Sequence, residues 1–203
     1  MENAQNASGE LMASGNRARE VSFPQSGWQK DGLLYDKWMS ATLESLEKDE
    51  EVLEFLREVD SQLATIGYTE HGIRHSRLVA QRAREILLLL KFPKREAELA
   101  AIAGFLHDIG SLINRERHEE SSALLALPIL KRLGMPLSEI AKVISALGNH
   151  HEETGTPISP IAAALILADK SDVHFSRVRN PDRIKFDIHD RVNYAVKGSK
   201  LTC

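Results

Sequence analysis

Apolar residues recur three and four positions apart along most of the chain, which is the spacing of helices that bury one face. The first such stretch covers residues 33–59, and Asp49 divides it into two predicted helices. A stronger helix with a wide apolar face is predicted over residues 71–90. These two stretches therefore predict three helices in the first half of the chain.

Proline and glycine residues divide the rest of the chain into further helices. Pro93 marks the start of a helix that is nearly all apolar up to His107 and ends at Gly110, where we expect a left-handed C-terminal cap. Three more helices are predicted over residues 116–133, 138–149 and 161–172. Only the segment RVNYAV near the C-terminus has the composition of a strand. We therefore predict an all-α fold, a compact bundle of several helices.

The apolar periodicity also divides the chain into three parts. Residues 1–30 are rich in Asn, Ser, Gly and Ala without periodicity, which predicts a flexible N-terminal tail. Residues 31–180 form the predicted helical domain, and residues 181–203 form a C-terminal extension. This extension stops at GSKLTC without a recognisable cap, the pattern of a domain truncated before its natural end.

Composition narrows the class of protein. With 42% hydrophobic and 27% charged residues, the chain has the balance of an ordinary soluble globular protein. Its formal net charge of -3 gives no electrostatic case for binding nucleic acid or an anionic membrane. The only cysteine, Cys203, cannot form a disulfide or a cysteine-based zinc site within one chain. Because a signal peptide and an apolar run of about 18 residues are both lacking, we expect a cytoplasmic protein.

Two aspartates and a histidine stand where polar groups are costly. His107 and Asp108 close an apolar helix, and a bound cation would satisfy them there. Asp169 follows the apolar run IAAALILA and needs either a metal or a basic partner. Lys170 and Arg177 are the alternative partners in a simple salt bridge. Together with the other candidate ligands, these positions favour a metal site.

Further histidines lie at the ends of other predicted helices. His75 and His71 are one helical turn apart, and we favour His75 as the ligand. His118 opens a helix, where a neutral, metal-bound imidazole is better tolerated than a charged one. The alternative is that His118 belongs to an exposed polar helix start. His150 ends another helix and is preferred to its neighbour His151. Mixed histidine and carboxylate ligands suit Mn, Fe, Ni, Zn or Mg.

A second His-Asp pair, His189 and Asp190, has a different setting. Alternating charges surround it in DRIKFDIHDRVNYAV, where the first pair follows a buried helix. We therefore assign this second pair a structural or surface role.

The candidate ligands together match a known sequence signature. His75, His107-Asp108 and Asp169, in the segments HSRLVA, AGFLHDIG and LILADKSDV, resemble the H…HD…D signature of the HD superfamily of metal-dependent phosphohydrolases. The resemblance covers about residues 68–180. His118 and His150 are similar to the extra histidines of HD proteins with a binuclear centre, including the HD-GYP group that cleaves cyclic di-GMP. The GYP tripeptide and the acidic pair of ppGpp-hydrolysing members are both absent, which disfavours these two substrates.

The resemblance implies an activity and roles for several residues. One or two divalent metal ions would bind a phosphate oxygen of the substrate and lower the pKa of the attacking water. Asp108 would bridge two ions, while Lys170 and Arg177 would neutralise phosphoryl charge or remain solvated helix-end charges. The implied substrate is a phosphate-containing small molecule such as a nucleotide. The alternatives are a non-catalytic HD module that binds a nucleotide or a partner protein, and an oxygenase with a di-iron site.

Overall fold

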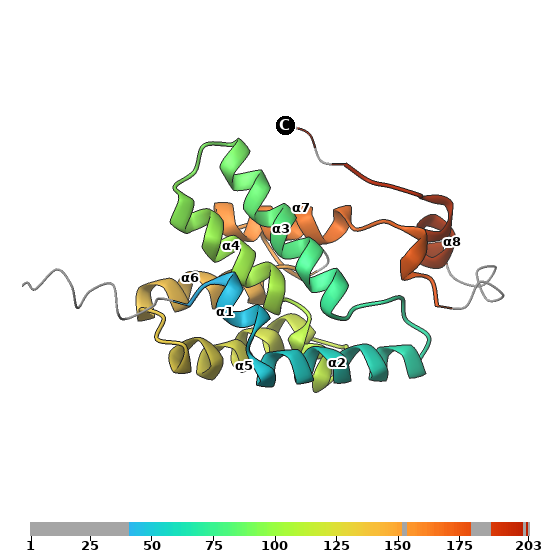
Figure 1. The fold of residues 1–203 in the computed structure, drawn as a ribbon, viewed down its shortest axis with the longest axis horizontal. Helices are drawn as coiled ribbons and strands as arrows, with labels where there is room; N and C mark the ends of the chain where they lie inside the picture. The colour runs from blue at the N-terminus through green and yellow to red at the C-terminus, as the bar shows by residue number, and fades with distance from the viewer. Residues whose placement is uncertain (1–40, 152–153, 180–187, 201, 203) are drawn as a thin grey trace, which may run out of the picture.

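The computed structural model describes residues 41–151, 154–179, 188–200 and 202, and within them it is all-α, as predicted, with no strand. The predicted tail over residues 1–30 lies outside the described residues. Figure 1 shows the helices packed into one bundle, with the last of them set to one side. The elements are α1 (Leu43–Glu47), α2 (Glu50–Thr65), α3 (Ile73–Leu89), α4 (Lys94–Leu106), η1 (Ile109–Leu112), α5 (His118–Arg132), α6 (Leu137–Gly148), α7 (Pro160–Ser171), η2 (Phe175–Arg177) and α8 (Ile188–Ala195).

The predicted break at Asp49 is confirmed. The Asp49 carboxylate accepts a hydrogen bond from the Val52 amide at 3.2 Å and so caps the start of α2. The preceding helix, α1, begins with a capping box in which Thr42 and Ser45 each satisfy the other's backbone amide. Short polar side chains therefore start both helices where the sequence changes its periodicity.

Helix α4 lies at the centre of the bundle. It contacts α1, α3, α6 and α7, and Figure 1 shows α3 running alongside it. Contact on all sides explains why the helix is apolar all round from Leu99 onward, with Ile102, Phe105 and Leu106 fully buried. Although α4 and α7 are rich in apolar residues, no helix in the described part of the chain is long and apolar enough to cross a membrane. The polar residues that follow Leu106 are consequently held in the interior.

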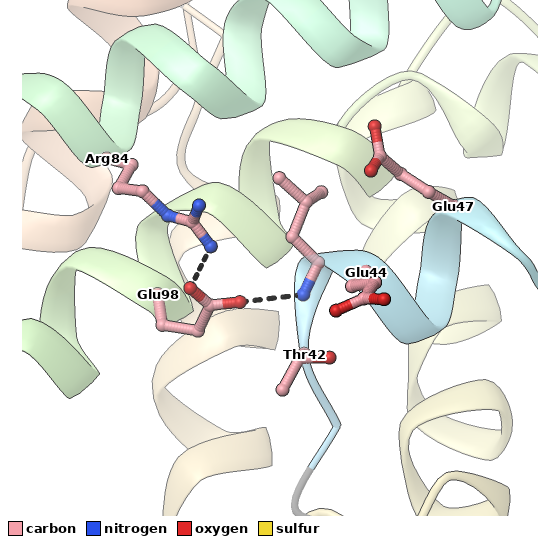
Figure 2. A pocket seen from close by; sticks show the side chains of 6 residues that line it. Thr42, Glu44, Glu47, Arg84 and Glu98 are labelled. Atoms are coloured by element: carbon pink, nitrogen blue, oxygen red, sulfur yellow. Dashed lines mark hydrogen bonds and ion pairs between the residues drawn. The ribbon is translucent and has the colours of Figure 1, made fainter.

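A hollow of about 340 Å³ lies between α1, α3 and the first half of α4, which contributes Glu98 to its lining. Figure 2 shows Glu98 of α4 joined to Arg84 of α3 and to the backbone of α1. The latter bond runs from the Leu43 amide to Glu98 Oε1 at 2.7 Å. Glu98 thereby joins both α1 and α3 to the central helix.

The end of α4 differs from the prediction. The helix stops at Leu106, and the chain continues through His107 and Asp108 into η1. Gly110 does not adopt a left-handed conformation, so the predicted cap is wrong. Among the described glycines, positive φ angles occur at Gly67, at 90°, and at Gly134, at 75°. A Cβ on Gly110 would lie only 2.2 Å from the His118 carbonyl oxygen. Glycine is needed here because the backbone passes close to the start of α5.

The segment with strand composition is helical. Most of RVNYAV belongs to α8, and Asp190 and Asn193 are buried with two exposed residues between them. A spacing of three fits a helix, whereas a strand buries every second residue. Asn193 Oδ1 accepts from the His174 amide at 3.1 Å and holds α8 against η2. Asp190 of the second His-Asp pair is thus buried in this helix, while the side chain of His189 lies outside the described residues.

Candidate metal centre

The six side chains predicted as metal ligands converge at the end of α4. They come from α3, α4, α5, α6 and α7, or from the residues that directly follow these helices. All six side chains are largely buried, and the most exposed of them, that of Asp169, is 14% exposed. The six are His75, His107, Asp108, His118, His150 and Asp169.

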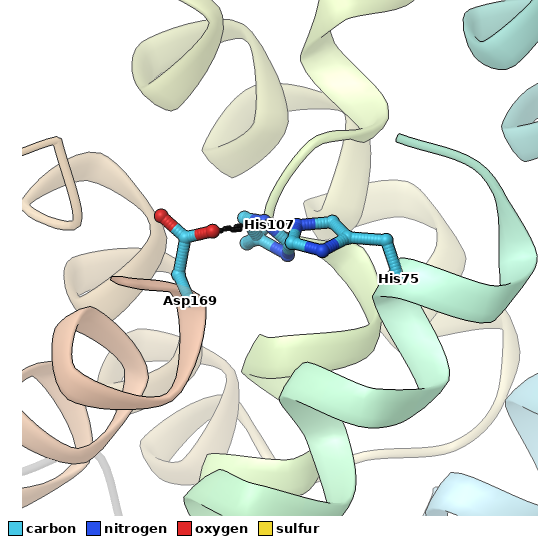
Figure 3. Close-up of side chains that lie close together, drawn as sticks. All are labelled: His75, His107 and Asp169. Atoms are coloured by element: carbon cyan, nitrogen blue, oxygen red, sulfur yellow. Dashed lines mark hydrogen bonds and ion pairs between the residues drawn. The ribbon is translucent and has the colours of Figure 1, made fainter. Parts of the chain in front are cut away.

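Four of these side chains form a first group. Nε2 of His75 lies 3.2 Å from Nε2 of His107 and 3.3 Å from Oδ1 of Asp169. Figure 3 shows these three side chains pointing toward one another from separate helices. Oδ2 of Asp108 lies 3.1 Å from Nε2 of His107 and 3.5 Å from Nε2 of His75. Two nitrogens and two carboxylate oxygens therefore face a common point. The four side chains that supply them, those of His75, His107, Asp108 and Asp169, are called the first group.

The remaining two histidines form a second group with the other oxygen of Asp108. Nε2 of His118 lies 3.1 Å from Nε2 of His150 and 3.4 Å from Oδ1 of Asp108. Ligand atoms of His107, Asp108 and His150 also lie within 4.8 Å of one another. Asp108 thus stands between the two groups and presents one oxygen to each, which is the geometry of a bridging carboxylate.

All four histidines direct Nε2 toward the centre. In each ring Nδ1 lies within hydrogen-bond distance of an oxygen acceptor, and an Nδ1 that faces a backbone carbonyl must carry the proton. In a neutral imidazole this arrangement leaves Nε2 without a proton, so its lone pair can bind a metal. The acceptors are Asp172 Oδ2 for His75 at 2.7 Å, Gly104 O for His107 at 2.8 Å, Arg115 O for His118 at 3.1 Å and Leu147 O for His150 at 2.7 Å.

The centre therefore fits a cation. In each group two Nε2 atoms face each other at 3.1–3.2 Å, and a cation or a proton is needed between two such lone pairs. Oδ2 of Asp108 is buried and has no hydrogen-bond partner among the described residues. A buried carboxylate oxygen needs a positive partner, which is protonated His107 at 3.1 Å in the metal-free protein and would be a bound cation in its place.

The pKa values show that the two groups differ in charge. Burial opposes charge on His107, but Asp108 and Asp169 outweigh it and raise the pKa of His107 to about 10. The pKa of each of these two aspartates lies well below its ordinary value despite burial, because protonated histidine is close by. Burial lowers the pKa of His118 to about 4 and that of His150 to about 3. The first group thus holds positive charge between its carboxylates, and the second consists of neutral imidazoles.

A layer of charged side chains supports His75 from behind. Asp172, whose side chain is fully buried, lies 2.7 Å from Nδ1 of His75 and 3.0 Å from Nη2 of Arg74. Arg177 donates to the backbone carbonyls of Asp172 at 2.7 Å and Glu70 at 3.2 Å. The structure thus places Arg177, a predicted phosphoryl-binding residue, behind a ligand. Asp172 is not among the residues predicted from the sequence, although its position three residues after Asp169 at the end of α7 was an available signal.

The other predicted side chains lie at the margins of the centre. Lys170 is half exposed, with Nζ 3.1 Å from Oδ2 of Asp169. His71 is buried with Nδ1 2.7 Å from a backbone carbonyl, and it belongs to neither candidate ligand group. The ring of His151 lies 5.5 Å from that of His118, and its buried Nδ1 has no partner in the part of the chain that the structure describes. The preference for His75 and His150 as ligands stays a prediction.

One arginine at the centre was missed by the sequence analysis. Nη1 of Arg115 donates to Oδ1 of Asp108 at 2.8 Å and to Oγ of Ser111 at 3.2 Å. Its guanidinium carbon lies 5.7 Å from the centre of the Tyr68 ring, in a cation–π contact. The available signal was position, since Arg115 stands in the short loop between the His-Asp pair and His118.

The described helices form an all-α bundle in which histidines and aspartates meet in groups that could hold a metal ion of the kind bound by mixed His and carboxylate ligands. The sequence model of the HD domain matches residues 72–173, which is half of the chain. The chain therefore belongs to the HD domain family. The matched region contains all six candidate ligands.

Two relatives and one solved structure are similar to parts of the chain. An uncharacterised protein of Methanocaldococcus jannaschii is 30% identical over 147 residues, which cover 61% of this chain and 56% of the relative. Ribonuclease Y of Lawsonia intracellularis is 34% identical over 109 residues, 52% of this chain and 18% of that enzyme. The crystal structure of a predicted HD superfamily hydrolase from an uncultured Thermotogales bacterium is 30% identical, with a TM-score of 0.48 over 61% of this chain and 67% of that one. The chain thus spans little more than half of the first relative and less than a fifth of the second.

Proposed function

We propose that this protein is a metal-dependent phosphohydrolase that hydrolyses a phosphoester or phosphoanhydride bond, in a nucleotide or a related small molecule. The observation that carries the proposal is the position of Asp108. Its two buried oxygens face two separate groups of histidine nitrogens, and Oδ2 lacks any other partner among the described residues. A carboxylate in this position has the form of a bridge between two divalent cations.

The side chains suggest how the cations would be held. His75, His107, Asp108 and Asp169 would hold the first, and His118, His150 and the other oxygen of Asp108 the second. This donor set suits Mn, Fe, Ni, Zn or Mg. When bound, such a cation polarises a phosphoryl oxygen and lowers the pKa of water to near neutrality.

The protein's own groups would orient the reaction. Asp172 fixes the His75 ring, and Arg177 holds Asp172 through its backbone carbonyl, so Arg177 acts as a positioning residue. Lys170, which is half exposed beside Asp169, would neutralise charge that develops on the phosphoryl group. Because the centre is buried, these charges act in a low dielectric, where each is worth more than in water.

One relative supports a phosphoester substrate. Ribonuclease Y is named for action on RNA, whose backbone is a chain of phosphodiesters, and this chain is 34% identical to part of it. The formal net charge of -3 does not favour binding along an extended polyanion. A small phosphate-bearing molecule therefore suits this chain better than a long nucleic acid.

Turnover by the metal-loaded protein tests the proposal. We expect the protein loaded with Mn²⁺ to release phosphate or a nucleotide from at least one member of a panel of nucleotides, phosphomonoesters and pyrophosphates. Chelation and the His107→Ala variant should each abolish this release. Asp190→Asn, which alters the second His-Asp pair in α8, is the matched control and should retain it. Metal binding without turnover on any member would instead favour the non-catalytic HD module.

A further inference from the structure

Arg115 connects the two groups of the centre. Its side chain donates to Oδ1 of Asp108 at 2.8 Å, and its backbone carbonyl accepts from Nδ1 of His118 at 3.1 Å. The side chain is 25% exposed, while that of Asp108 is 2% exposed. One residue therefore touches both the bridging carboxylate and a histidine of the second group, and it extends from the interior toward solvent.

Several N–H groups of the Arg115 guanidinium make no hydrogen bond to the described residues. Both of its hydrogen bonds come from Nη1, which reaches Asp108 and Ser111. For Nε and Nη2 the described residues supply no hydrogen-bond acceptor, although a guanidinium carries five N–H groups. Nε–H and an Nη2–H together form the planar fork that matches two phosphate oxygens. The Tyr68 ring and Ser111 hold the group in place, so this fork is partly preorganised.

The other nearby cations are less suited to bind a phosphoryl group between the two groups. Arg177 is buried and donates to backbone carbonyls behind His75. Lys170 lies on the far oxygen of Asp169, in the first group alone. Only Arg115, among these three, contacts the carboxylate that both groups share.

We propose that Arg115 is the residue that binds a phosphoryl group of the substrate, through the Nε–H and Nη2–H fork, while Nη1 stays on Oδ1 of Asp108. This inference rests on the proposed function. Oδ1 also faces His118, so a cation in the second group and the Arg115 guanidinium compete for the same oxygen. Two positive groups on one carboxylate oxygen repel each other, and a phosphate placed between them relieves that repulsion. Phosphate and the second cation should therefore bind cooperatively in the presence of Arg115.

Titration with Mn²⁺ alone and with inorganic phosphate tests this role without measuring turnover. We expect Arg115→Met to weaken phosphate binding to the Mn²⁺-loaded protein at least about tenfold, as the loss of a charge-assisted bidentate contact requires. The same variant should bind the second Mn²⁺ more tightly than wild type when phosphate is absent, because the competing cation is gone. Arg115→Lys, which keeps the charge and loses the fork, should have an intermediate phosphate affinity.

Arg117→Met is the matched control. Arg117 lies two residues away in the same loop, its side chain is 75% exposed, and it pairs with Glu120 at 2.5 Å. Both titrations should match wild type in this control. If Arg115→Met does not fold, as judged by its thermal unfolding, Arg115→Lys carries the test alone and must still weaken phosphate binding.

The outcomes separate the two proposals. Wild-type protein that takes up no Mn²⁺ overturns the proposed function and this inference with it. Wild-type protein that binds Mn²⁺, with phosphate affinity unchanged in both Arg115 variants, overturns only the role of Arg115.

Discussion

The Asp172→Asn substitution removes one negative charge from directly behind His75 while it preserves the size of the side chain. Oδ2 of Asp172 lies 2.7 Å from Nδ1 of His75, and both side chains are fully buried. The carboxylate fixes the ring with Nε2 toward the first group and makes that nitrogen a stronger ligand. An asparagine either accepts the same hydrogen bond weakly or turns its amide group toward the ring. Both arrangements weaken His75 as a ligand.

The size of the effect follows from the surroundings of Asp172. Replacing a residue that supports a metal-bound histidine reduces metal affinity about 10- to 100-fold, which corresponds to about 1.4–2.7 kcal/mol. The same oxygen also lies 3.0 Å from Nη2 of Arg74 and 3.6 Å from Nε of Arg177. Because both arginines lose their charged partner next to the metal, we expect a reduction near the upper end of that range.

Calorimetric titration of metal-free protein with Mn²⁺ measures this affinity. Asp49→Asn is a suitable control, since Asp49 also pairs with an arginine, Arg132 at 2.7 Å, and caps α2 away from the centre. The control should lower the free energy of unfolding without changing Mn²⁺ affinity. An Asp172→Asn protein that binds Mn²⁺ as tightly as wild type would refute the reasoning that Asp172 acts through His75.

Two further predictions concern pH and backbone packing. In metal-free protein, burial lowers the pKa of His118 to about 4 and the pKa values of His150 and His71 to about 3, so the folded protein takes up these protons only below the ordinary histidine range. Above the unfolded pKa of about 6.5 these histidines do not reduce the free energy of unfolding. As pH falls below that value the free energy of unfolding decreases, by about 2 kcal/mol for each residue at pH 5. Urea unfolding at pH 7 and pH 5 measures this decrease, and equal stabilities at the two pH values would contradict it. In Gly110→Ala the new Cβ collides with the backbone at the start of α5, so fewer Mn²⁺ ions should bind per chain by elemental analysis. Gly198→Ala, whose Cβ meets nothing within 4 Å, is the control, and equal metal content in both variants would contradict this reasoning.

Periodicity and end signals predicted the helices because each depends on nearby residues. Asp49 ends one pattern and caps the next helix, which a local rule can detect. The exit from α4 could not be predicted this way, because Gly110 is required by the approach of α5, a contact between segments. The strand composition of RVNYAV misled for a similar reason: the contact of α8 with η2 favours a helical spacing of buried residues.

The predicted ligands were recognisable because a buried histidine or aspartate at the end of an apolar helix needs a partner. The residues around them were harder to find, since long side chains reach distant partners. Arg177 lies in a segment after α7, yet it donates to the backbone at Glu70, more than a hundred positions earlier. Arg115 is one of many arginines in the sequence, and only the folded chain brings it onto Asp108. Their roles depend on tertiary contacts that no local pattern contains.

The most direct test of the account is the metal content of the purified protein, compared between wild type, Asp108→Ala and the control Asp190→Ala. Asp108 is the one candidate ligand that presents an oxygen to both groups, whereas Asp190 belongs to the second His-Asp pair in α8. Elemental analysis should find divalent metal in wild type and in Asp190→Ala, and should find most of it missing from Asp108→Ala. Equal metal content in all three proteins would contradict the assignment of Asp108 as the bridging ligand of a metal centre.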